Sequence, residues 1–164
     1  MSNDATVTLR PARPDDAPAV GAIWHAGWRD GHLGNVPDEL TRIRTEESFG
    51  ERAAQHVEDT VVAVVDGEVA GFVMVAGDEV EQVYVDREYR GAGVAGLLLR
   101  EAERQVAADG HDVAWLAVAA GNARARAFYE RQGWRDAGDL PYEVEALGER
   151  FVSPCRRYEK SARP

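Results

Sequence analysis

Cysteine is almost missing from this chain of 164 residues, in which Cys155 is the only one. A single thiol excludes an internal disulfide framework and most zinc sites, which need several cysteine or histidine ligands. The sequence also has no histidine and carboxylate cluster at metal-ligand spacing, no Gly-x-Ser-x-Gly elbow and no Cys–His nucleophile signature. These absences predict a protein without a bound metal and without a serine or cysteine nucleophile.

Long apolar stretches are missing as well. No window of 18 or more apolar residues occurs, so no membrane span is expected. The first six residues lack the basic start and apolar run of a signal peptide. These features favour a soluble, cytoplasmic protein. The length suits one domain, expected over residues 1–164 with its core at about 6–160.

Positive charge is scarce, because 19 basic residues face 29 acidic ones and the net charge is −10. This excess disfavours nucleic acid and anionic membrane as partners, and it favours cationic small molecules or peptides, such as amines, through electrostatic steering. Solubility or a composition bias explains the same charge, since every basic residue except Lys160 is an arginine. The charge alone leaves both interpretations open.

The order of hydrophobic patterns predicts an α+β fold with interleaved strands and helices. Strands are expected at 6–11, 60–65, 68–76, 79–85 and 112–119, with two more in 135–160 around Gly148. Helices are expected from a cap at Asp15 or Asp16 to about residue 30, at 92–109, and from a cap at Asn122 to near Gly133. Residues 31–37 read as a loop, and 38–59 as one or two helices interrupted near 48–50.

The most informative segment, residues 83–96, joins an alternating apolar strand to a glycine-spaced turn and a helix. Backbone N–H groups at a helix start have no intrahelical partner and carry partial positive charge. Glycine lacks the side chain that would keep a pyrophosphate away, and Arg87 and Arg90 can add charge from the flank. The segment therefore predicts an anion site at Arg90, Gly91, Ala92, Gly93, Val94, Ala95 and Gly96.

The same turn fits the Gly-x-Gly-x-x-Gly string of dinucleotide-binding folds. Two observations oppose that interpretation: the turn follows an apparent antiparallel meander at mid-chain, and no acidic residue closes a second strand about 20 residues later. A Walker A string is also absent, since the chain has no Gly-Lys-Ser/Thr.

A second segment, residues 122–134, follows the strand at 112–119. Together the two segments resemble the GNAT superfamily of acyl-CoA-dependent N-acetyltransferases. In the first motif Arg90, Gly93 and Ala95 match. In the second the matches are Asn122, Ala125, Phe128, Tyr129, Glu130 and Gly133, with Trp134 in place of the usual phenylalanine. The resemblance extends over about 6–160 and is weakest at 31–59.

This resemblance implies a mixed, strongly twisted sheet flanked by helices, with acetyl-CoA as co-substrate. It implies that the amides of the turn hold the pyrophosphate, while the main chain of Val83, Tyr84 and Val85 pairs with the pantetheine arm. Asn122 would bind pantetheine as well as cap its helix. Arg87, Arg90, Arg124 and Arg126 could form the basic patch that an anionic cofactor needs in an acidic protein.

The family also suggests catalytic residues. The Val85 amide would donate to the acetyl carbonyl oxygen, and Tyr129 would protonate the departing thiolate, although Tyr129 also fits a core aromatic. Glu79 and Glu81 lie two apart on a strand and are expected to share one face. Either could take a proton from the incoming ammonium, and a solvated strand edge is the alternative.

A stripe of aromatic and basic residues marks the first helix: Trp24, His25, Trp28 and Arg29. In the resembling fold this helix and the following loop wall the acceptor site, where a cationic amine could lie over a tryptophan face. Core packing is the simpler interpretation of these aromatics.

The sequence thus predicts acetyl transfer from acetyl-CoA to a primary amine by direct attack in a ternary complex. A non-catalytic acyl-CoA-binding or sensor module of the same fold is the alternative. The sequence leaves the acceptor amine and the length of the acyl group open, and a homodimer is a possibility that the family suggests.

Overall fold

The computed structural model describes residues 6–32, 38–146 and 148–163. Within this part of the chain, seven strands form one mixed sheet in the order β1-β2-β3-β4-β5-β7-β6. The strands are β1 (Val7–Pro11), β2 (Thr60–Val65), β3 (Glu68–Ala76), β4 (Glu79–Val85), β5 (Val113–Ala119), β6 (Arg135–Ala146) and β7 (Glu149–Ser161). All neighbouring strands run antiparallel except β4 and β5, which are parallel.

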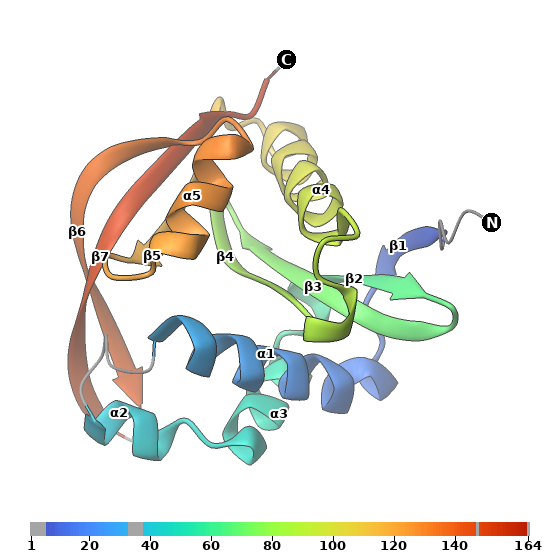
Figure 1. The fold of residues 1–164 in the computed structure, drawn as a ribbon, viewed down its shortest axis with the longest axis horizontal. Helices are drawn as coiled ribbons and strands as arrows, with labels where there is room; N and C mark the ends of the chain where they lie inside the picture. The colour runs from blue at the N-terminus through green and yellow to red at the C-terminus, as the bar shows by residue number, and fades with distance from the viewer. Residues whose placement is uncertain (1–5, 33–37, 147, 164) are drawn as a thin grey trace.

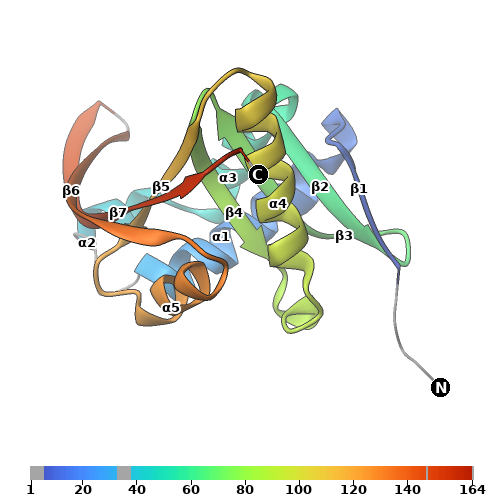
Figure 2. The ribbon, with the colours of Figure 1, turned by 90° about the horizontal axis from the view of Figure 1, so that it is seen from above.

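Helices cover both faces of this sheet, as Figure 1 shows. On one face lie α4 (Val94–Ala108) and α5 (Ala123–Arg131), and on the other lie α1 (Ala17–His32), α2 (Asp38–Ile43) and α3 (Glu46–Gln55). Viewed from above, the β6–β7 hairpin extends beyond the rest of the sheet (Figure 2).

Each face of the sheet has its own core. The α4 core contains a stripe at helical spacing, Val94, Leu98, Leu99, Ala102 and Val106, packed on Val73, Val75 and Val80 of the sheet. The α1–α3 core packs Val20, Ile23, Trp24 and Trp28 of α1 and Phe49 of α3 against Phe72 and Met74. Alternation along β3 sends its side chains to the two cores in turn, so this strand is buried on both faces.

The predicted interruption near residues 48–50 is wrong, because the helices separate at residues 44–45. Thr45 has an extended backbone, and its Oγ1 accepts a hydrogen bond from the Ser48 N–H at 3.1 Å, which caps α3. Gly50 lies inside α3 and therefore does not mark a turn.

The start and the end of α1 also differ from the prediction. Asp15 and Asp16 lie in a short 3-10 turn before α1, and the Asp16 carboxylate accepts from the Arg10 guanidinium at 2.7 and 3.0 Å and from the Arg13 N–H at 2.8 Å. The helix continues through Gly31 and His32, and residues 33–37 of the predicted loop lie outside the described part of the chain.

Helices α1 and α3 approach each other at two glycines. A Cβ atom added to Gly21 would lie 2.6 Å from the Gly50 Cα and 2.8 Å from its nitrogen, whereas one added to Gly50 would have nothing within 4 Å. Backbone atoms cannot swing aside as a flexible side chain can, so the contact requires glycine at position 21 and not at position 50.

This asymmetry predicts opposite effects for two matched substitutions. Both Gly21→Ala and Gly50→Ala gain about 1 kcal/mol of helix propensity, but only Gly21→Ala introduces a clash, which costs roughly 1–3 kcal/mol. The free energy of unfolding of Gly21→Ala should therefore lie below that of Gly50→Ala by the cost of the clash. Urea unfolding at a common m-value measures the difference, and equal midpoints would contradict the packing described here.

Candidate active site

The strands β4 and β5 meet at one end and separate toward the other. Among the described residues, their parallel register consists of one pair, Glu79 with Trp115. The Trp115 N–H donates to the Asp78 carbonyl at 3.0 Å, and its indole Nε1–H donates to the Asp78 carboxylate at 3.0 Å. Beyond this pair, β4 and β5 share no further register pair among the described residues, while β5 stays paired with β7 over Val113–Ala119. A wedge therefore opens between β4 and β5.

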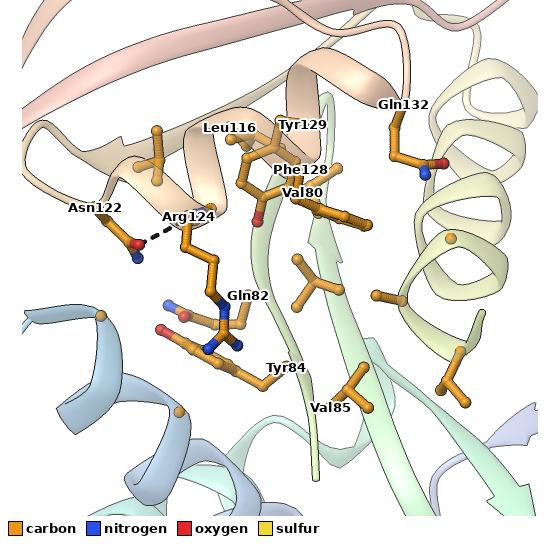
Figure 3. A pocket seen from close by; sticks show the side chains of 18 of the residues that line it. Val80, Gln82, Tyr84, Val85, Leu116, Asn122, Arg124, Phe128, Tyr129 and Gln132 are labelled. Atoms are coloured by element: carbon orange, nitrogen blue, oxygen red, sulfur yellow. Dashed lines mark hydrogen bonds between the residues drawn. The ribbon is translucent and has the colours of Figure 1, made fainter. Parts of the chain in front are cut away.

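A pocket of about 880 Å³ occupies the wedge (Figure 3). It brings together the strand, turn and helix segments that the sequence predicted to act together. The strands contribute residues 80–85 of β4 and 116–119 of β5 to the lining, and the turn contributes Arg90, Gly91 and residues 93–96. The residues around α5 that line it are Asn122, Arg124, Ala125, Phe128, Tyr129, Arg131 and Gln132. Helix α1 contributes Gly27, Asp30 and Gly31. Ala92, which was predicted with the turn, is exposed and is not among the lining residues.

Two main-chain N–H groups of β4 point into the wedge. The Asp86 N–H donates to the Ala70 carbonyl of β3 at 2.8 Å. Because peptide groups alternate along a strand, the N–H groups of Val83 and Val85 point to the opposite edge, toward β5. Since β5 has already diverged there, these groups are available to a ligand that adds as a strand.

The turn that follows β4 presents a helix start to the pocket. Gly91 and Gly93 have φ values of 86° and 79°, which side chains rarely tolerate, and Gly93 is the N-cap of α4 without a side-chain cap. The first N–H groups of α4 therefore have no intrahelical acceptor, and they lie where the pocket passes Val94 to Gly96. This arrangement suits an anion.

Four arginines line the pocket of this acidic protein: Arg90, Arg100, Arg124 and Arg131. Arg100 and Arg131 were not singled out in the sequence, although Arg100 follows Gly96 by one helical turn. Figure 3 shows Arg124 extending from α5 toward β4. Of the other two arginines proposed for the basic patch, neither lines the pocket: Arg126 bonds the Tyr158 hydroxyl and Asp136, and Arg87 bonds Asp30.

Asp30 of α1 also reaches the turn. Its carboxylate forms an ion pair with Arg87 and accepts from Arg90 Nη2 at 3.0 Å. The hydrogen bonds from Arg87 and Arg90 lower the pKa of Asp30 below its ordinary value, against the opposing effect of burial. One of the pocket's four arginines is thus already paired with a carboxylate of the same chain.

Tyr129 is positioned by a capped helix. The Asn122 side chain accepts from the Ala125 N–H at 3.1 Å, as predicted for an N-cap, and this bond starts α5 (Figure 3). The Tyr129 ring contacts Phe128, Trp134 and Tyr158 at centroid distances of 5.4, 6.4 and 6.1 Å, and its hydroxyl points into the pocket. Burial raises the pKa of Tyr129 and of Tyr84, so both phenols stay protonated at neutral pH.

A β-bulge separates Glu79 from Glu81. Val80 pairs with Val75 and Gln82 pairs with Met74, so Glu81 is an extra residue with no partner across the ladder. The expectation that Glu79 and Glu81 share a face assumed a regular strand, and the bulge breaks that alternation. Glu81 is exposed and lines the pocket, whereas Glu79 lies beside Trp115 at the closed end and is not among the lining residues.

The aromatic stripe of α1 lies mainly in the core. Trp24 and Trp28 are 2% and 8% exposed, and the Arg52 guanidinium covers Trp24 at 4.3 Å from the ring centroid. His25 is half-buried against Phe49, at 5.7 Å between centroids, and Arg29 is exposed. None of the four predicted acceptor-site residues lines the pocket.

The face of α1 that does reach the pocket includes Gly27, which the sequence left unassigned to the site. A Cβ atom there would lie 2.3 Å from the Tyr84 ring, so glycine lets the helix pack directly on that tyrosine. In the sequence, the sign of this close contact is a glycine inside a predicted helix.

Comparison with known proteins agrees with this geometry. The model of the Acetyltransferase (GNAT) family matches residues 22–134. The chain belongs to this family. Members of the GNAT family use acetyl-CoA as acyl donor, and the mixed sheet with helices on both faces is the fold expected of them.

Several solved structures share the fold. A GCN5-related N-acetyltransferase from Rhodopseudomonas palustris is 24% identical, with a TM-score of 0.72 and 96% of each chain covered. The PaiA N-acetyltransferase from Thermoplasma acidophilum, solved with coenzyme A, is 19% identical, with a TM-score of 0.68 and 95% and 99% covered. The putative acetyltransferase yncA from Salmonella typhimurium, solved with acetyl-CoA, is 16% identical, with a TM-score of 0.69 and 98% and 96% covered. No curated protein matches the chain.

The described residues contain no group of three or more His, Cys, Asp or Glu side chains that could hold a metal ion. They also contain no helix long and apolar enough to cross a membrane.

The raised pKa of Tyr129 predicts a loss of stability in alkali. An unfolded chain ionises its tyrosines near pH 10, whereas the raised pKa of Tyr129 keeps that residue protonated in the folded state. The unfolded state then binds fewer protons, so the stability that Tyr129 contributes is present below about pH 10 and is lost as the pH rises further. Urea unfolding across this range should show a shallower decline for Tyr129→Phe than for the wild type, and parallel declines would argue against burial of this phenol.

Proposed function

We propose that this GNAT protein transfers the acetyl group of acetyl-CoA to a primary amine by direct attack in a ternary complex. The observation that carries the proposal is the wedge between β4 and β5, where the N–H groups of Val83 and Val85 face away from β3 and lead toward the start of α4, in a pocket lined by four arginines. A linear ligand with an amide-containing arm and an anionic pyrophosphate suits both parts.

The donor would lie along β4. Its pantetheine arm would pair with the main chain of Val83 to Val85 and with the Asn122 side chain, and its pyrophosphate would bind the N–H groups of Gly93 to Gly96. Arg90 and Arg124 would neutralise charge from either side. This assignment of the motifs follows the family resemblance.

The chemistry needs three groups. The amine nitrogen attacks the acetyl carbonyl carbon, and the Val85 N–H stabilises the negative charge that develops on the oxygen. The tetrahedral intermediate then expels the CoA thiolate, which takes a proton from the Tyr129 hydroxyl, and the proton that the former amine nitrogen must lose returns to the Tyr129 phenolate through water. Tyr129 suits this role by its position, because its hydroxyl points into the pocket and a phenol is protonated at neutral pH.

The amine arrives as an ammonium ion and must lose a proton before it attacks. Glu81 is the better candidate base, because it lines the pocket and sits at the bulge between the pocket-lining residues Val80 and Gln82. Its negative charge would also attract the cation, in keeping with the acidic character of the whole chain.

The test is release of free CoA from acetyl-CoA in the presence of a panel of amines. Wild-type protein should turn over at least one amine, and Tyr129→Phe should lower kcat by about 10- to 1000-fold, since water can partly replace the phenol as acid. Tyr158→Phe is the matched control: it removes a buried hydroxyl that bonds Arg126 and Glu130 outside the pocket.

Acetyl-CoA should also raise the melting temperature of wild type and of both tyrosine variants, because it binds the folded state alone. A thermal shift with acetyl-CoA but no turnover of any amine would replace the enzyme by a non-catalytic acyl-CoA-binding module. No shift and no turnover would reject the proposal.

The two glutamates form a second matched pair. Glu81→Gln should lower kcat/KM for the amine by about 10- to 100-fold, toward the lower end of general-base effects, while the KM for acetyl-CoA stays nearly constant. Glu79→Gln should have a smaller effect, because Glu79 lies at the closed end of the wedge. The reverse order of effects would assign the base to Glu79.

A further inference from the structure

Two polar side chains of β4, Gln82 and Tyr84, lie half-buried on the wall of the pocket. Among the described residues neither the Gln82 carboxamide nor the Tyr84 hydroxyl forms a hydrogen bond. The polar ends of both side chains point to the side of the pocket where α1 lies (Figure 3). Groups of this kind usually have a hydrogen-bond partner once they leave bulk water, and a molecule in the pocket can supply it.

Both side chains project from the face of β4 that is turned toward α1. Their partners across the ladder, Met74 and Phe72, are also two residues apart, so the strand is regular here and the two side chains share a face. The Tyr84 ring lies 5.9 Å from the Phe72 ring centroid and would meet a Cβ atom added to Gly27 of α1 at 2.3 Å. The turn proposed for the donor pyrophosphate lies with α4 on the other face of the sheet. The two side chains are therefore left for the second substrate.

Along β4 this pair lies between two groups that the proposed chemistry uses. Glu81, the candidate base, directly precedes Gln82. The Val85 N–H, which would donate to the acetyl oxygen, belongs to the peptide bond that joins Tyr84 to Val85. An amine that gives a proton to Glu81 and attacks a carbonyl held by the Val85 N–H would therefore lie beside the two polar side chains, which can reach the atoms next to its nitrogen.

The polar ends of these two side chains carry three donor hydrogens. A phenol is protonated at neutral pH and donates one hydrogen, and a carboxamide donates two. A carbonyl oxygen has two lone pairs and no hydrogen, so it can accept from both side chains at once. The ionised carboxylate of Glu81, by contrast, only accepts and suits the ammonium group. The base and the polar pair together match a molecule that has a carbonyl oxygen beside its amine.

We propose that the Gln82 and Tyr84 side chains bind a carbonyl oxygen next to the reacting amine, so that the acceptor is an α-amino acyl compound. This inference rests on the proposed function, because it names the class of the second substrate of the same reaction. A free amino acid offers this oxygen as a carboxylate, and an amino-acid amide offers it as an amide. A polyamine or another simple amine lacks it and would leave both donors to water.

The first experiment measures CoA release by wild-type protein with matched acceptors that share one side chain. Each set contains the free L-amino acid, its carboxamide and the decarboxylated amine. Expressed per concentration of unprotonated amine, kcat/KM for the better of the two carbonyl compounds should exceed that for the decarboxylated amine by about tenfold or more, the scale of two hydrogen bonds. The comparison of acid with carboxamide identifies which of the two carbonyl groups the acceptor carries.

The second experiment removes one polar group at a time. Tyr84→Phe and Gln82→Leu should each lower kcat/KM for the carbonyl compound by about 3- to 20-fold, the scale of one hydrogen bond, and change it less than about twofold for the decarboxylated amine. Because each variant is compared with wild type on the same substrate, the basicity of the amine cancels. The KM for acetyl-CoA should stay constant. The matched controls Tyr158→Phe and Gln105→Leu remove the same groups from residues outside the pocket lining and should keep the wild-type preference.

The outcomes separate this proposal from the function on which it rests. If no amine of any kind releases CoA, the acetyltransferase function fails. If amines turn over but both variants keep the wild-type preference, or lower kcat/KM equally for carbonyl compounds and decarboxylated amines, the function stands and the carbonyl subsite is overturned. The subsite is also overturned if the variants act only by raising the KM for acetyl-CoA, since Gln82 and Tyr84 would then serve the donor.

Discussion

The site depends on the clamp between Asp78 and Trp115. These residues hold β5 against the first residue of β4 through one main-chain and one side-chain hydrogen bond, and the two strands are free to separate beyond it. A regular parallel pair would have satisfied the Val83 and Val85 amides within the sheet and closed the pocket. The pocket is therefore a consequence of pairing between β4 and β5 that stops after one residue pair. The Val83 and Val85 N–H groups that face it are those that β5 would have bonded if the pairing had continued.

Charge is distributed unevenly over the molecule. The chain carries a net charge of −10, yet four arginines line one pocket. Elsewhere arginines form ion pairs with carboxylates, as in the Arg126–Asp136–Arg156 network that joins α5, β6 and β7. The net charge thus sets the electrostatic potential at long range, whereas the arginines that line the pocket set the local potential that a bound group would experience.

The sequence predicted the parts of the site that depend on neighbours along the chain. The turn at Gly91 and Gly93 requires positive φ, and the Asn122 cap acts within three residues, so both are visible as short patterns. The bulge at Glu81 was not predictable, because it is defined by pairing with Met74 and Val75 on β3. Contacts between distant segments also determine the burial of Trp24 and the lining of the pocket by Arg100 and Arg131, which short patterns along the chain do not contain.

Asp30 gives the empty pocket a resident anion. Because its carboxylate already bonds Arg87 and Arg90, a phosphate that binds Arg90 must displace it or share the guanidinium with it. Binding at the turn is then an exchange of one oxyanion for another, and its free energy is the difference between two charge-assisted contacts. The displaced carboxylate belongs to the last turns of α1, so the same exchange would loosen the tie between that helix and the turn. Occupancy of the turn would in this way be linked to the position of α1, which lines the same pocket.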